Sequence, residues 1–236
     1  MKILCIDTAT EACSAALMLD DVCDGIFDVC PQQQSQRILP MIDEILTRHK
    51  VKVSELDAIA YGRGPGSFTG VRIASSTVQG LALGCDLPVI EVSTLAAMAQ
   101  ENFEVYKVEK TLALIDARMS EVYCGEFFIN EAGVAQCTGE EAVLLPSALL
   151  SVLSAYTDND TNIVEESFVG TGFHAYQQEL ALQLQSHKLA VNYPNARYML
   201  ALAKWQFANG VKVSVEQIQP VYLRDKVTWK KLPNRE

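Results

Sequence analysis

The stretch YGRGPGSFTGVR, residues Tyr61–Arg72, holds four of the thirteen glycines of the chain. The apolar run Leu56–Tyr61 before it predicts a β-strand, and Val71–Leu83 after it predicts a helix. A glycine-rich turn from strand to helix lets backbone pass where no Cβ would fit, and it points free N–H groups at whatever lies above the helix. The pattern is typical either of a tightly packed turn or of a site for an anion or nucleotide.

The loop does not match the common motifs for phosphates or nucleophiles. Pro65 lies inside it and has no N–H to offer a phosphate. No Gly-Lys-Ser/Thr follows, which excludes a Walker A loop. The glycines are Gly62, Gly64, Gly66 and Gly70. Their spacing differs from the dinucleotide-binding fingerprint, and the nucleophile elbow needs one residue between Gly66 and the following serine.

Length, composition and charge restrict the class of protein. The 236 residues, 49% hydrophobic and 20% charged, allow one large or two small domains with a sizeable core. No run approaches the ~20 apolar residues of a membrane span, and we expect a mature first strand at the N-terminus rather than a signal peptide. Seven cysteines without a Cys-x-x-Cys pair indicate thiols in a reducing cytoplasm. The formal net charge of -10 repels phosphate backbones, so we expect no useful nucleic-acid binding by the chain alone.

The order of predicted elements repeats once along the chain. Lys2–Asp7 reads as a strand that ends in Asp and leads into a hairpin, and Thr111–Asp116 does the same. Helices and strands alternate after each hairpin. The charged segment Asn102–Lys110 separates the halves, so we expect subdomains at residues 1–101 and 102–236. This repeat predicts a duplicated α/β fold of the actin-like kind, which is ribonuclease H-like and shared by sugar kinases, Hsp70 and actin.

Two predicted helices of the first half carry candidates for a partner interface. The first follows the polar segment Gln32–Ser35 and has an apolar face wider than one sheet needs. The second places Ser76, Gly80 and Gly84 at four-residue spacing, which permits close approach of another helix. Deep burial of the first helix and ordinary internal packing of the second are the alternatives. The interface candidates are Ile38, Ile42, Ile45, Arg72, Ser76 and Gly80.

Three stretches together resemble the bacterial TsaB family, also called YeaZ. They are Ile6–Thr10 (IDTAT), Gly62–Arg72 (GRGPGSFTGVR) and Pro220–Arg224 (PVYLR). The resemblance covers essentially the whole chain, and its central motif is long and specific. It implies the actin-like fold. It also implies a non-catalytic role in adding a threonylcarbamoyl group to the adenosine beside the anticodon of tRNAs that read codons starting with A.

The resemblance implies protein partners and no cofactor. Members of this family bind the related catalytic subunit TsaD, the ATPase TsaE joins that complex, and members alone form homodimers. This chain would therefore meet tRNA only through the complex, in the cytoplasm. The catalytic paralogue holds a metal with a His-x-x-x-His pair, whereas the corresponding stretch Gln34–Ile38 has no histidine. We expect no catalytic residue, no metal and no peptidase activity, since no His-Glu-x-x-His motif occurs.

Asp7 and the glycine loop have two interpretations. In the actin-like superfamily, an acid that ends the first strand helps to hold magnesium near a nucleotide phosphate. Alternatively, the polar side chains of this turn satisfy its own backbone N–H groups, which the missing histidines favour. The candidate residues for either role are Asp7, Thr8, Thr10, Gly64, Gly66 and Ser67. Asp116 has the same two interpretations. The rival function is thus an ATP-binding enzyme of the superfamily with this turn as its phosphate site.

Overall fold

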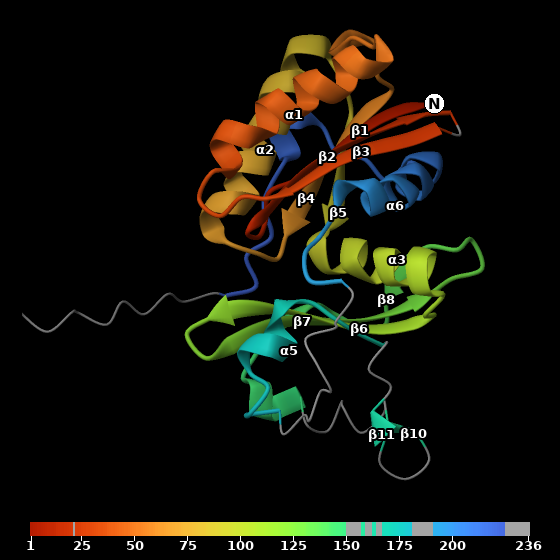
Figure 1. Ribbon diagram of the computed structural model, residues 1–236. Helices are drawn as coiled ribbons and strands as arrows, with labels where there is room; N and C mark the ends of the chain where they lie inside the picture. Colours follow the sequence, from red (N-terminus) through yellow and green to blue (C-terminus); the bar gives the residue numbers. More distant parts are fainter. Residues whose placement is uncertain (21, 150–156, 159–161, 164–166, 181–190, 225–236) are drawn as a thin grey trace, which may run out of the picture.

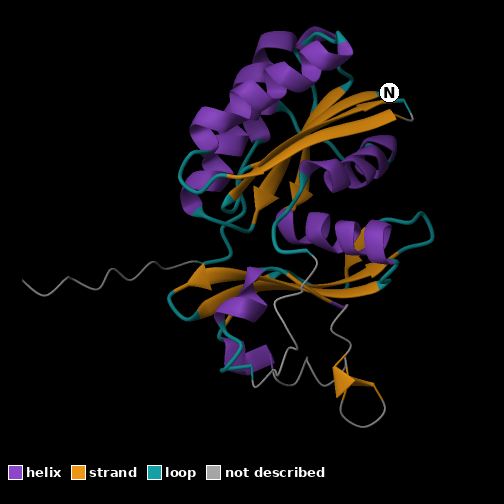
Figure 2. Ribbon diagram, viewed as in Figure 1, coloured by secondary structure: helices purple, strands orange, loops and turns teal. Residues whose placement is uncertain are grey.

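Two β-sheets lie in separate layers, with helices between them and on their outer sides (Figure 1). The computed structural model describes residues 1–20, 22–149, 157–158, 162–163, 167–180 and 191–224. From top to bottom of Figure 2, the layers are a helix pair, the first sheet, a second helix pair, the second sheet and a short helix. This alternation lets each sheet bury its apolar faces against helices of the same chain.

The first sheet has the strand order β3-β2-β1-β4-β5. The strands are β1 Lys2–Asp7, β2 Ala12–Leu19, β3 Val22–Val29, β4 Ala58–Gly64 and β5 Val89–Ser93. The first three form an antiparallel meander, and β4 and β5 continue it in parallel. β1 and β4 are almost wholly buried, because helices cover both faces of the sheet. This explains why both strands are nearly continuous apolar runs.

Three helices cover the first sheet. α1 Gln34–His49 and α2 Phe68–Cys85 lie on its outer face, and α6 Ala196–Ala208 lies on the face that looks toward the second sheet (Figure 1). α6 belongs to the second half of the chain and still packs on the first sheet, so the two halves interlock.

The apolar side of α1 is turned inward. Ile38, Ile42 and Ile45 are 1%, 3% and 0% exposed and pack in the core formed with the first sheet and α2. Leu39 is the large apolar side chain that α1 leaves exposed, at 55%. The apolar side of α1 is thus wider than the sheet alone covers, and α2 buries the rest, which is the deep burial that the sequence analysis gave as the alternative. Because these isoleucines are buried, they would contribute to a partner interface by positioning α1 and not by direct contact. That role stays a prediction.

The second sheet repeats the plan of the first. Its order is β12-β6-β7-β8, with β9 also paired to β7. The strands are β6 Lys110–Arg118, β7 Glu121–Ile129, β8 Ala135–Cys137, β9 Ala142–Leu144 and β12 Phe168–Val169. β6 and β7 form an antiparallel hairpin like β1 and β2, and β12 joins β6 in parallel as β4 joins β1. The repeat confirms the predicted duplicated α/β fold.

Short elements complete the described chain. They are the two-stranded pair β10 Thr157–Asp158 and β11 Asn162–Ile163, the helix α5 Thr171–Ala175, and 3₁₀ turns at Val53–Glu55, Pro146–Leu149 and Val215–Gln217. α5 packs against β6 on the side of the second sheet that faces away from α3 (Figure 1).

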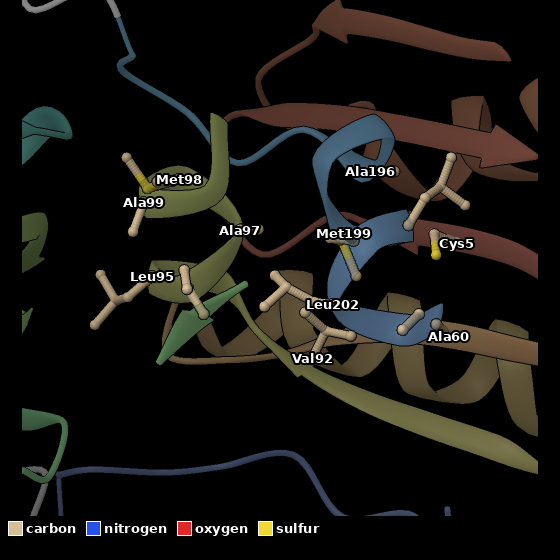
Figure 3. Close-up of a cluster of buried hydrophobic side chains, with 14 of the residues drawn as sticks. Cys5, Ala60, Val92, Leu95, Ala97, Met98, Ala99, Ala196, Met199 and Leu202 are labelled. Atoms are coloured by element: carbon tan, nitrogen blue, oxygen red, sulfur yellow. The ribbon is translucent and has the colours of Figure 1, made fainter. Parts of the chain in front are cut away.

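A cluster of buried apolar side chains joins the two halves (Figure 3). α3 Thr94–Tyr106 packs on the second sheet and against α6, which packs on the first. The labelled members are Cys5, Ala60 and Val92 from the first sheet, Leu95, Ala97, Met98 and Ala99 from α3, and Ala196, Met199 and Leu202 from α6. The expected division at residues 101 and 102 falls inside α3, which continues to Tyr106. The separate functions of residues 1–101 and 102–236 stay a prediction.

Candidate functional site

The glycine loop leaves β4 beside the end of β1 and enters α2. Gly64 has a φ of +100°, a left-handed conformation that favours glycine, and Pro65 follows it in a cis peptide bond. The Ser67 side chain then accepts a hydrogen bond from the N–H of Gly70 at 3.0 Å and caps the helix. The strand, turn and helix that the sequence predicts are therefore all present.

The space above this loop is filled by the chain itself. A Cβ on Gly66 would lie 2.4 Å from the carbonyl oxygen of Ala9, and one on Gly70 would lie 2.1 Å from that of Thr8. The Ser67 N–H donates to Ala9 O at 2.7 Å, and the Thr8 hydroxyl donates to Gly70 O at 2.7 Å. The glycines thus allow two stretches of backbone to lie against each other, and the loop N–H of Ser67 is already used.

Asp7 ends β1 beneath the same loop. Its side chain is closed off from solvent, and a Cβ on Gly62 would lie 1.8 Å from Oδ2. Oδ1 accepts the N–H of Ala9 at 2.9 Å, whereas Oδ2 has no hydrogen bond within the described part of the chain. Burial raises the pKa of Asp7 to about 7, against the lowering influence of the Ala9 N–H and the Thr94 hydroxyl. Thr10, also buried, accepts the N–H of Ala12 at 3.3 Å.

The second strand-end acid, Asp116, is engaged by several partners. Its carboxylate pairs with the Arg118 guanidinium at 2.8 Å and accepts the Tyr176 hydroxyl at 2.9 Å. Arg118 also reaches Glu11 in the first half at 2.9 Å. A guanidinium therefore lies between the turns that follow the first strands of the two halves. Because Arg118 is exposed, this contact adds little stability.

The outer face of α2 carries the other candidates. Arg72, Ser76, Gly80 and Gly84 are exposed, and a Cβ on Gly80 would meet nothing within 4 Å. Leu83, a residue that sequence reasoning missed, is 70% exposed beside this stripe. Among the described residues, a Cβ on Gly84 would likewise meet nothing within 4 Å, so this stripe leaves room for the close approach of another helix.

An aromatic stack continues this face at the start of α2. The Arg72 guanidinium lies 3.4 Å from the centroid of the Phe68 ring, and its Nε donates to the Tyr222 hydroxyl at 2.9 Å. The two rings have centroids 5.7 Å apart. Phe68 is 59% exposed and Tyr222 is 44% exposed. Aromatic and arginine side chains of this kind are enriched in protein interfaces. Phe68 and Tyr222 were not among the interface candidates named from the sequence. The one signal available for Phe68 was the position of this residue in the motif Gly62–Arg72, just before the predicted helix.

Metal ligands and membrane spans are not found in the described residues. No group of three or more His, Cys, Asp or Glu side chains is placed there to hold a metal ion. His49 pairs with Asp24 at 2.9 Å, His174 lies in the last turn of the short helix α5, and His187 lies outside the described residues. None of the helices in the described ranges is long and apolar enough to cross a membrane.

Comparison with known proteins agrees with this architecture. The family model for TsaD, tRNA N6-adenosine threonylcarbamoyltransferase, matches residues 28–232. The tRNA threonylcarbamoyladenosine biosynthesis protein TsaB of Escherichia coli (strain K12) is 45% identical over 239 residues, covering 100% of both chains. The chain belongs to the TsaB (YeaZ) family.

Other TsaB-family proteins match over nearly the full length. TsaB of Haemophilus influenzae is 41% identical over 250 residues, covering 100% of this chain and 99% of the relative. The solved structure of YeaZ from Pseudomonas aeruginosa superposes with a TM-score of 0.81 at 38% identity, covering 94% of this chain and 99% of that one. A second solved structure, with a TM-score of 0.79, is described as similar to the peptidase YeaZ, and that wording is a label of similarity.

The three stretches that carry the TsaB resemblance meet in space. The turn after β1 packs on the glycine loop, and the N–H of Val221 donates to Arg63 O at 2.8 Å. Arg224 then pairs with Glu121 and donates to the carbonyl oxygens of Ala117 and Arg118, both at 3.2 Å. The segment Pro220–Arg224 thereby ties the glycine loop of the first half to the β6–β7 turn of the second.

Proposed function

We propose that the chain is a non-catalytic scaffold subunit in the formation of threonylcarbamoyladenosine on tRNA, and that it binds a TsaD-type catalytic subunit. The observation that carries this proposal is the outer face of α2, which exposes a small-residue stripe between Phe68 and Leu83. The E. coli relative is named for this modification, and the matching family model describes the transferase. A chain built like the transferase, with its glycine loop closed by its own backbone, suits a structural role beside it.

One surface would serve both the homodimer and the heterodimer with the TsaD-type subunit. Arg72, Ser76 and Gly80 lie at its centre, with Leu39 of α1 as the neighbouring exposed apolar side chain. A second copy of the chain can close on such a surface with two-fold symmetry, and a related TsaD-type chain can take the same place. The homodimer and the heterodimer would then compete. A TsaE-type ATPase would join through the complex, and residues 1–101 would supply the partner contacts.

The remaining parts of the proposal follow from charge and chemistry. The chain would work in the cytoplasm without a cofactor, would cleave no peptide and would meet tRNA only within the complex. The hydroxyl, carboxyl and N–H groups of the Asp7 turn would then serve to hold the glycine loop, since the hydrogen bonds described above lie within the chain.

The substitution Gly80→Arg tests the interface. Because a Cβ at Gly80 meets nothing within 4 Å, the variant should fold. In a close helix packing the guanidinium would be buried without a partner, which costs several kcal/mol. We expect a monomer by light scattering, no capture of the TsaD-type subunit in a pull-down and no support of tRNA modification in cells.

Ala208→Arg is the matched control. Ala208 is exposed at the end of α6, which covers the face of the first sheet opposite to α2 (Figure 1). The control should dimerise and capture the partner like the wild type. If folded Gly80→Arg protein also does both, the interface lies elsewhere and the proposal fails.

Nucleotide titration separates the scaffold from an ATP-using enzyme. We expect the isolated chain to bind ATP negligibly and to turn over neither ATP nor peptides, because backbone fills the loop. ATP turnover that disappears in Asp7→Ala would instead establish the enzyme and refute the scaffold.

A further inference from the structure

A cavity of about 800 Å³ lies between the two halves of the molecule, beside Arg63 at the start of the glycine loop. Its walls are the ends of β4 and β5, the segment 134–141, the end of α6 with residues 210–213, and the C-terminal segment at Val221 and Leu223. Sites for small molecules have volumes of roughly 300–1,000 Å³ and combine apolar walls with a few polar groups. This cavity meets that description, and the proposed scaffold role does not use it.

The main polar group of the cavity is the Glu141 carboxylate. Its side chain is only 7% exposed. The Ser93 hydroxyl donates to Oε1, whereas the Arg63 nitrogen lies 3.4 Å from Oε2. Close hydrogen bonds between a cation and a carboxylate measure about 2.7–2.9 Å, and a carboxylate can accept about four hydrogen bonds. The Glu141 carboxylate can therefore accept further hydrogen bonds from the N–H groups of a ligand.

The charges around the cavity favour a cation. Three acids, Glu91, Glu140 and Glu141, face two bases, Arg63 and Lys212, and the protein as a whole has a net charge of -10. Lys212 is partly engaged elsewhere, since its ammonium lies 5.6 Å from the centroid of the Phe207 ring. An anionic ligand would be repelled by the excess of carboxylates, whereas an amine or guanidinium would be attracted.

The remaining wall is apolar and aromatic. Val92 of β5 and Leu202 of α6 lie side by side in the cluster of Figure 3 and form the buried back of the wall, at 0% and 4% exposed. The accessible apolar side chains of the wall include Trp205, Val211 and Leu223. An indole ring attracts a cation over its face, and aliphatic walls bury an apolar stem. The wall therefore complements a ligand that carries its charge on a hydrocarbon chain.

We propose that this cavity binds a small organic cation, with an amine or guanidinium group at Glu141 and an apolar stem against Trp205, Val211 and Leu223. The same chemistry could come from a free amine or from a basic side chain of a protein. Agmatine represents the first source, and a capped Ala-Arg-Ala peptide represents the second.

Isothermal titration calorimetry of the full chain at physiological ionic strength tests the site. Agmatine should bind saturably at one molecule per chain, whereas n-butanol at equal concentration should not. Glu141→Gln keeps the shape and the Ser93 contact and removes the charge, so affinity should fall at least tenfold, or 1.4 kcal/mol. Trp205→Leu keeps the acid but reduces the apolar area against which the stem packs, and it should weaken binding by about two- to fivefold.

Glu131→Gln is the matched control, because Glu131 is exposed and lies outside the cavity wall. It removes the same charge and should leave the affinity unchanged. Tighter binding of the peptide than of agmatine would support the site and identify a protein side chain as the source. Absence of agmatine binding by the wild type, an unaltered affinity in Glu141→Gln, or an equal loss in Glu131→Gln would overturn the proposal.

Discussion

At the scale of single residues, Asp7 is a buried acid whose surroundings disfavour its charge. One oxygen accepts a backbone N–H, and the other has no hydrogen bond among the residues described. The raised pKa of about 7 follows mainly from burial. In the unfolded chain the pKa of an aspartate is about 3.9. Between these two pH values the unfolded state has released a proton that the native state still holds.

Asp7→Asn should therefore change how stability depends on pH. Since the unfolded state binds fewer protons over this range, the wild type loses stability as pH rises from about 4 to about 7. The loss is about 1.4 kcal/mol for each pH unit. The amide keeps an acceptor for the Ala9 N–H and carries no charge. We expect the variant to be more stable than the wild type at pH 8, with the difference shrinking toward pH 4.

Urea denaturation at intervals between pH 4 and pH 8 measures this effect. Asp43→Asn, at an exposed position of α1, is the control and should follow the wild type throughout. A constant difference between Asp7→Asn and the wild type at every pH would show that the Asp7 carboxyl is not buried in this way.

At the scale of elements, the C-terminal segment holds the β6–β7 turn against the first half. That turn contains three successive non-glycine residues with positive φ, Arg118, Met119 and Ser120, at 61°, 58° and 61°. Such conformations cost free energy and persist where surrounding contacts hold them. The Arg224 guanidinium, 16% exposed, supplies those contacts through Glu121 and the carbonyl oxygens before and within the turn.

Arg224→Gln should destabilise the fold by about 1–3 kcal/mol, because a half-buried carboxylate and two carbonyl oxygens lose their donor. A double-mutant cycle with Glu121→Gln, read by urea denaturation, should give a coupling free energy of about 0.5–3 kcal/mol. Arg37→Gln is the control, since the Arg37–Asp28 pair is 42% and 47% exposed and should contribute about 1 kcal/mol or less. An Arg224→Gln variant that costs no more than this control would show that the segment is not fastened by Arg224.

At the scale of the whole molecule, the acidic surface determines which partners the chain can meet alone. A net charge of -10 opposes the binding of a polyanion. The isolated chain should therefore show no shift of tRNA in a gel at physiological salt. A tRNA shift should emerge when the TsaD-type subunit is added. Tight, salt-sensitive binding by the chain alone would contradict the prediction.

The amino-acid sequence by itself determined the family, the duplicated α/β plan and the position of the glycine loop. These features follow from short-range patterns, which predict local structure wherever the segment lies in the fold. The patterns are the alternating apolar runs, Asp7 and Asp116 at strand ends, and the motif Gly62–Arg72. The four-residue spacing of Ser76, Gly80 and Gly84 was visible for the same reason, since it depends only on neighbours within one helix.

Only the tertiary structure decided what each face meets. Periodicity showed that α1 has a wide apolar side, but the sheet and α2 bury Ile38, Ile42 and Ile45 from two directions. The glycines could equally have opened a phosphate site, but the Thr8–Ala9 backbone fills the space. Tyr222 meets Arg72 across 150 positions of sequence. Contacts between such distant segments depend on how whole layers pack, and no local pattern in the sequence records that packing.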